Sequence, residues 1–174
     1  MTETEFRAAF RQHKDAVYRF AWRMTNSAAA AEDIAQDVFL TLLRRPDCFD
    51  RKRGELRSFL LGVARNLALK KWRDEGRWDV LDDQNFFVLP VDAASGEIAR
   101  IVGEAVNSLP PLQREVLILA QYEGNSLDEI ASAVESDVGT VKARLHRARE
   151  NLRHILAPLK ESMGRTSAPN GTPK

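Results

Sequence analysis

The sequence predicts an all-α fold of two small helical domains joined by an acidic linker, the second domain containing a helix-turn-helix. Apolar residues recur at spacings of three and four along two stretches, as on one face of amphipathic helices. Neither stretch shows a strand-like alternation of convincing length. Between them the periodicity fails, and acidic residues with Gly, Pro and Ser replace it. We therefore expect domains over residues 1–75 and 98–158, a linker over 76–97 and a disordered tail over 159–174.

Length and composition limit the class of protein. The 174 residues suffice for one ordinary domain or two small ones, and 44% hydrophobic with 29% charged residues suit a soluble protein with packed cores. The net charge is only +1, so any nucleic-acid binding must come from local clustering of charge. The single cysteine, Cys48, excludes an internal disulfide, and neither a signal-peptide pattern nor a membrane-spanning apolar run is present. We expect a cytoplasmic protein without membrane insertion.

The first domain is predicted to contain three helices. The first covers residues 3–24, with Phe6, Phe10, His13, Val17, Phe20 and Met24 on one face. Either Asn26 or Ser27 can cap the second helix, which Pro46 ends. A basic loop then leads to a third helix over residues 56–73, and the three apolar stripes can be buried against each other.

The second domain is predicted to begin with a helix over residues 98–109. Pro110 and Pro111 stop it, and Pro111 suits the first turn of the next helix because that position needs no amide donor. This fifth helix is expected to end around Gly124.

A helix-turn-helix is predicted to follow. Ser126 and Glu129 form a capping box ahead of a short helix over residues 127–134. After a turn, Ser136 is expected to cap a longer basic helix that ends near Pro158. A short capped helix, a tight turn and a longer basic helix are typical of a DNA-reading module.

The last helix has one apolar and one basic face. Val138, Val141, Leu145, Ala148 and Leu152 should face the core, whereas Lys142, Ala143, His146 and Arg147 project from the opposite side. Arg147 is suited to a bidentate contact with guanine, and Thr140, Arg144 and Arg149 to phosphate contacts. A merely solvated basic face is the alternative. A membrane-surface helix is disfavoured, because packing consumes the apolar face and exposed aromatic residues are lacking.

Three motifs in order resemble bacterial sigma factors of the extracytoplasmic-function (ECF) class. Residues 109–152, LPPLQREVLILAQYEGNSLDEIASAVESDVGTVKARLHRARENL, resemble the fourth conserved domain of these factors. AEDIAQDVFLTLLRRP resembles the helix that binds core polymerase, and FDRKRGELRSFLLGVARNLALKKWR resembles the −10-reading loop and helix. The resemblance covers residues 6–156. It implies a subunit that directs core RNA polymerase to promoters by reading −35 duplex DNA and melted −10 DNA.

The resemblance also implies a site for core polymerase. The matching positions are Asp33, Gln36, Asp37 and Leu40, whose spacing places them on one strip of the second helix. Two carboxylates flanking a glutamine suit a polar grip on basic residues of the polymerase clamp. A solvated helix face is the alternative. A catalytic role for the two aspartates would need a pocket with a metal or a base, which the sequence does not offer.

The resemblance places −10 DNA recognition on the loop and third helix, where basic residues cluster. The implied set is Phe49, Arg51, Lys52, Arg53, Arg57, Arg65, Asn66, Lys70 and Arg73. The loop over residues 49–56 would capture a flipped base, at a cost of a few kcal/mol in stacking that the pocket must offset. Asn66 is the expected base reader, with Arg65, Lys70 and Arg73 on phosphates. Trp72 either stacks on a base or packs against the domain.

We therefore expect an ECF sigma factor that contacts the clamp and flap elements of core RNA polymerase, promoter DNA and an anti-sigma factor. The linker would thread through basic polymerase channels. We expect no enzyme activity, cofactor or metal, because the sequence has no zinc motif, phosphate loop or nucleophile–base pair. The alternatives are an independent regulator that uses only the helix-turn-helix, and an enzyme or interaction module with an incidental basic surface.

Overall fold

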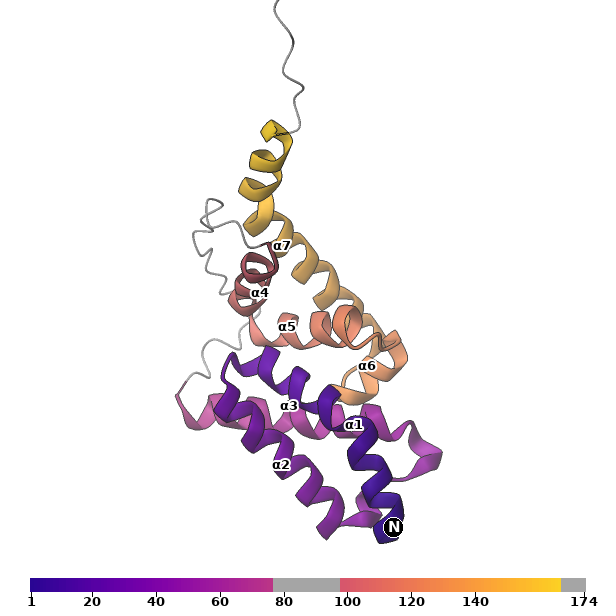
Figure 1. Cartoon of the computed structure of the whole chain (residues 1–174). Helices are drawn as coiled ribbons and strands as arrows, with labels where there is room; N and C mark the ends of the chain where they lie inside the picture. Colours follow the sequence, from indigo (N-terminus) through magenta and orange to yellow (C-terminus); the bar gives the residue numbers. More distant parts are fainter. Residues whose placement is uncertain (77–97, 167–174) are drawn as a thin grey trace, which may run out of the picture.

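The computed structural model describes residues 1–76 and 98–166 of the chain. Within these two ranges the chain forms helices and turns and no strand, so the predicted all-α class is confirmed. The predicted acidic linker, apart from Gly76, and the last eight residues of the predicted tail lie outside the described residues. Figure 1 shows two helical groups, with α1–α3 forming one and α4–α7 forming the other.

The first helical group contains α1 (Glu3–Thr25), α2 (Ala28–Arg44), η1 (Pro46–Cys48), η2 (Arg51–Arg53) and α3 (Leu56–Asp74). Asn26 ends α1 in a left-handed conformation with φ 51°, and the Ser27 hydroxyl accepts from the Ala30 amide at 3.2 Å to cap α2. Phe20 and Leu42 are among the side chains fully buried where the three helices meet. Burying these stripes supplies most of the packing energy of this group.

The second helical group contains α4 (Ile98–Ser108), α5 (Pro111–Leu117), the π-helical turn η5 (Ile118–Tyr122), α6 (Leu127–Ala133) and α7 (Val138–Thr166). Pro111 occupies the first turn of α5, as predicted, and Gly124 leaves η5 with φ 67°. The capping box between Ser126 and Glu129 is present, with both hydrogen bonds formed. The predicted proline at the start of α5 and the predicted capping box at the start of α6 are therefore both confirmed.

The last helix differs from the prediction at both ends. Asp137, not Ser136, caps α7: its carboxylate accepts from the Thr140 amide and hydroxyl, each at 2.8 Å. The carboxylate satisfies an otherwise unpaired amide and favours the positive end of the helix. At the other end Pro158 lies inside α7, which continues to Thr166. The helix bends toward its yellow C-terminal end (Figure 1), as expected where a proline removes one backbone hydrogen bond.

The two helical groups pack against each other through α3 and α6 and through the region of α1 and α5 (Figure 1). Gly62 on α3 permits the approach, because a Cβ built there would lie only 3.1 Å from the Ala133 carbonyl oxygen. Arg114 of α5 donates to the Met24 carbonyl oxygen at 2.8 Å, in the last turn of α1. That turn has carbonyls without helical partners, so the guanidinium satisfies one of them. None of the described helices is long and apolar enough to cross a membrane.

Candidate functional site

One exposed strip of α2 carries the residues predicted to bind core polymerase. The side chains of Asp33, Gln36 and Asp37 are exposed, and Leu40 is half-buried. Leu43, one turn further along, is 55% exposed, which is unusual for a leucine on a packed helix. Sequence reasoning missed Leu43, although it follows Leu40 by three residues and extends the same strip. The strip thus combines two carboxylates, an amide and an apolar end.

The basic loop after α2 is exposed in part. Arg51, Lys52 and Arg53 form η2 and are exposed; Arg51 approaches Glu5 at 3.8 Å, and Arg53 lines the cleft described next. Phe49 packs against Phe59 of α3, with ring centroids 5.5 Å apart. The loop is therefore anchored to α3 by an aromatic pair while its cations remain accessible.

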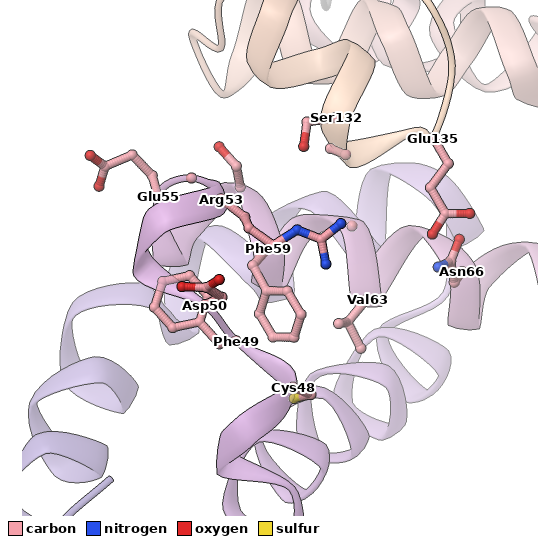
Figure 2. Close-up of a pocket in the computed structure, with 14 residues that line it drawn as sticks. Cys48, Phe49, Asp50, Arg53, Glu55, Phe59, Val63, Asn66, Ser132 and Glu135 are labelled. Carbon is pink, nitrogen blue, oxygen red and sulfur yellow. The ribbon is translucent and has the colours of Figure 1, made fainter.

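A cleft of about 350 Å³ lies between this loop, α3 and the second helical group. Its walls include Cys48, Phe49 and Asn66 from the first group, and Ser132 and Glu135 from the α6–α7 region. Figure 2 shows Ser132 and Glu135 on a separate ribbon facing the cleft, with Glu135 pointing toward Asn66. A cleft is thus present beside the loop that is predicted to read −10 DNA, and residues of the second group form part of its wall.

Two of the predicted −10 arginines are paired with acids of the second group. Arg57 donates from Nη2 to Glu123 Oε2 at 2.6 Å and from Nη1 to the Glu123 carbonyl at 2.8 Å. Arg65 forms a bidentate pair with Glu115, with N–O distances of 2.7 and 3.2 Å. The Glu115 side chain is fully buried and that of Arg65 is 12% exposed. Such charge-assisted bidentate pairs are stronger than neutral hydrogen bonds.

Asn66 is held beside this pair. Arg65 Nη1 donates to Asn66 Oδ1 at 3.0 Å, so the arginine also orients the amide of its neighbour. Asn66 is exposed, as are Lys70 and Arg73 further along α3. Of the predicted −10 residues, the structure therefore brings Phe49, Arg53 and Asn66 together at the cleft. Arg57 and Arg65 are paired with acids of the second group, and Lys70 and Arg73 are exposed further along α3.

The acids and the arginine that join the two groups were missed by sequence reasoning. Glu115 and Glu123 have side chains that are at most 1% exposed, and Arg114 is buried with its guanidinium 4.8 Å above the Trp72 ring. A signal was available: the charged pair at positions 114–115 interrupts a run that is otherwise almost entirely apolar. Buried charges of this kind require partners from elsewhere in the fold.

The predicted −35 face of α7 is open to solvent. Lys142, Ala143, His146, Arg147 and Arg149 are exposed. Two members of the predicted set lie differently. Thr140 is half-buried and bonded to the Asp137 cap, and Arg144 is half-buried with Nη1 3.9 Å from Glu115. The structure therefore brings most of the predicted set together and turns Arg144 toward the core side of the helix.

The structure also places three single residues, including Trp72, whose role the sequence left open. Trp72 is 2% exposed, so it packs between the groups rather than facing solvent. Cys48 is exposed. His13 is buried; burial lowers its pKa, the nearby charge of Arg57 lowers it further, and Glu55 acts in the opposite direction. In residues 1–76 and 98–166 no group of three or more His, Cys, Asp and Glu could hold a metal ion.

Comparisons with known proteins match both helical groups. The family model for Sigma-70 region 2 matches residues 9–77, and that for Sigma-70 region 4 matches residues 99–152. The ECF RNA polymerase sigma factor SigW of Bacillus subtilis is 33% identical over 84% of this chain and 86% of its own length. SigE of Mycolicibacterium smegmatis is also 33% identical over 84% of this chain, but the match covers 60% of that longer protein.

Two solved structures share the arrangement of helices. The sigma factor RpoE of Bartonella quintana, in complex with the anti-sigma factor NepR, is 28% identical with a TM-score of 0.70, covering 88% of this chain and 97% of that one. CnrH, in complex with the cytosolic domain of CnrY, is 25% identical with a TM-score of 0.68, covering 90% of each chain.

Proposed function

The chain belongs to the ECF class of RNA polymerase sigma factors, which direct core polymerase to promoters, and from that premise we propose which of its surfaces do so. We assign residues 1–75 to core binding and −10 recognition, 76–97 to the linker, and 98–158 to −35 recognition. The observation that carries the proposal is one chain with an exposed acidic strip on α2 and two separate basic surfaces.

The α2 strip is the proposed clamp-binding surface. Asp33 and Asp37 offer exposed carboxylates on successive turns, Gln36 lies between them, and Leu40 and Leu43 provide an apolar end. Such a mixture suits a basic and apolar helical partner, because the charges set orientation and the leucines supply burial. The flap of the polymerase is the proposed partner of the second helical group.

The basic surfaces are the proposed DNA sites. On the first group, Phe49, Arg53 and Asn66 line the cleft, and the proposed site also takes in Arg51, Lys52, Arg57, Arg65, Lys70 and Arg73 of the same loop and helix. A cleft of about 350 Å³ matches the scale of a pocket for one flipped base. On α7, Arg147 and His146 are exposed in the N-terminal half of the helix, where a recognition helix meets base edges.

Two further assignments follow from family membership. Sigma factors are not enzymes, and we propose that this chain has no catalytic activity of its own and acts in the cytoplasm, at the nucleoid, where the polymerase and promoters are. An anti-sigma factor is the second proposed partner, since the similar solved structure of RpoE is a sigma factor in complex with the anti-sigma factor NepR.

The test is the affinity for core RNA polymerase of the wild type and of an Asp33→Ala, Asp37→Ala double variant, with binding to duplex DNA measured in parallel. We expect tight core binding that falls at least tenfold in the variant, because two charge-assisted contacts are lost. An Asp15→Ala, Asp128→Ala variant removes the same charge from exposed positions elsewhere and should bind like the wild type. Strong binding to duplex DNA without core binding would favour the independent regulator.

A further inference from the structure

We propose that the second helical group holds the first in a self-inhibited state, in which Glu123 and Glu115 neutralise Arg57 and Arg65 and the α6–α7 region caps the −10 cleft. The inference rests on the proposed −10 role of this surface. We call the two ion pairs Arg57–Glu123 and Arg65–Glu115 the interdomain latch.

The charges of the latch match those of the DNA it would exclude. A carboxylate accepts from a guanidinium in the same bidentate way as a phosphate does. Glu115 holds Arg65 at 2.7 and 3.2 Å, and Glu123 holds Arg57 at 2.6 Å. Arg23 adds a third cation, 3.8 Å from Glu123. The acids thus occupy guanidinium donors that phosphates would otherwise bind, most completely at Arg65, which is 12% exposed against 35% for Arg57.

The cap on the cleft is steric as well as electrostatic. Ser132, Ala133 and Glu135 form one wall of the −10 cleft, and Glu135 points toward the proposed base reader Asn66 (Figure 2). The backbones approach so closely at Gly62 that a methyl group there would press on the Ala133 carbonyl. A strand of DNA with one base in the cleft therefore has no path between α3 and α6 in this arrangement.

The chemistry of the interface suits a reversible contact. Desolvating two carboxylates and their arginines costs nearly as much as the pairs return, so a buried ion pair is weak net stabilisation. Polar interfaces between domains of one chain accordingly permit relative motion. A competing partner that supplies phosphates can take over the arginines, while the released carboxylates regain their hydration as the groups separate.

The inhibition is selective. Lys142, His146, Arg147 and Arg149 on α7 are exposed in the same arrangement that covers Arg57 and Arg65. The latched chain should therefore bind duplex DNA carrying a −35 element while failing to bind and open the −10 element.

A reversible cross-link tests the proposal on the full chain. In a Cys48→Ser background, cysteines replace Arg23 and Tyr122, whose side chains contact each other across the two groups outside both DNA surfaces. A short bismaleimide linker with an internal disulfide locks the groups together, and reduction releases them. Promoters are first identified by run-off transcription of genomic fragments with the wild-type holoenzyme. We expect the locked protein to open promoters at least tenfold less than the released form, with unchanged binding to the −35 duplex.

Equal promoter opening by locked and released protein would overturn the proposal. Loss of −35 binding on locking would also count against it, because the latch leaves that face open. If the wild type itself neither binds core polymerase nor directs initiation, the proposed function fails instead. In that case small-angle X-ray scattering of the free chain still tests whether the interdomain latch holds the two helical groups together.

The scattering measurement compares a Glu115→Gln, Glu123→Gln variant with a Glu104→Gln, Asp128→Asn control of the same net charge. Glu104 and Asp128 are exposed in the same helical group, and Glu104 pairs with Arg100 of its own helix. We expect a larger radius of gyration for the first variant only. Identical scattering from both would show that the acids do not hold the groups together.

Discussion

The two basic surfaces of this chain differ in what covers them. On α3, Arg57 and Arg65 are paired with glutamates of the other helical group, and their side chains are 35% and 12% exposed. On α7, Arg147 and Arg149 lie on an exposed helix face. Both surfaces carry the same residue type, so residue identity alone does not distinguish a surface that is ready for DNA from one that is withheld. The difference lies in acids supplied from distant parts of the sequence.

The comparison also explains how a chain with a net charge of +1 can carry two basic surfaces. Some of the compensating acids lie in the predicted linker, and others are buried beside the arginines they neutralise. While the two groups are docked, the ion pairs with Arg65 and Arg57 offset most of the free energy that it costs to bury the Glu115 and Glu123 carboxylates. When the groups separate, the acids become solvated and the arginines become available to phosphates.

The largest expected effect comes from the most buried pair. Glu115→Ala leaves Arg65 without its bidentate partner in a nearly dry site, which costs the docked state about 3–5 kcal/mol. The matched variant Glu123→Ala should cost less, because Arg57 is more exposed and water can replace its partner. Amide hydrogen exchange along α3 and α6 measures the docking. Equal protection in wild type and Glu115→Ala would mean that the pair does not hold the groups.

Substitutions on the exposed basic face of α7 should change DNA binding and leave the docking of the two helical groups unchanged. Arg147→Ala is expected to weaken binding to its −35 duplex by about 1–3 kcal/mol and to relax preference at one base pair, while leaving docking of the groups unchanged. Arg149→Ala, a phosphate contact in the proposal, should weaken binding to all sequences and lower the salt slope by about one unit. Titrations against a set of single-base-pair variants separate the two. An unchanged promoter preference in Arg147→Ala would show that Arg147 does not read a base.

The local features of the fold were predictable because each depends on neighbouring residues. The capping box at Ser126, the proline at the start of α5 and the apolar stripe ending in Met24 are all short-range patterns. The prediction for the start of α7 was wrong by one residue, since Ser136 and Asp137 are both good caps and tertiary geometry chose the carboxylate. Pro158 was misread as a terminus because a helix can continue past a proline with a bend.

The candidate site was predictable as a set of residues but not as an arrangement. The family resemblance selects Asp33 and Asp37, and their spacing places them on one strip of α2. Nothing local links Arg65 to Glu115, which is 50 positions away. The sequence does mark Glu115 as unusual, since it is a charge among apolar residues of a short helix. A buried charge predicts that a partner exists, but only the packing of the two groups identifies which one.

A smaller effect is expected from a substitution that alters the contact between the two helical groups without changing any charged residue. Gly62→Ala puts a methyl 3.1 Å from the Ala133 carbonyl oxygen, so α3 and α6 must move apart by a few tenths of an ångström. The same change should stabilise α3 itself by about 1 kcal/mol, because alanine is the better helix former. We expect a more stable first group with a looser contact to the second. Hydrogen exchange that slows within α3 but speeds in α6 would show both effects, and Gly103→Ala, with open space around its Cβ, is the control.

The smallest expected effect concerns Asp137, which caps α7 where its exposed basic face begins. Hydrogen bonds from the Thr140 amide and hydroxyl lower the pKa of Asp137, so the folded state favours the ionised carboxylate. A lowered folded pKa gives stability that is present above the ordinary pKa of an aspartate and lost as the pH falls through the folded value. Asp137→Ala should therefore lower the melting temperature of the second group at neutral pH, and by less at a pH below the folded pKa, where only the neutral capping oxygen of the wild type is lost. Asp137→Asn keeps a capping oxygen and should retain most of the stability while losing its pH dependence. If the melting temperatures of wild type and Asp137→Ala differed equally at both pH values, the carboxylate charge would have no part in the cap, and the start of the recognition helix would depend on packing alone.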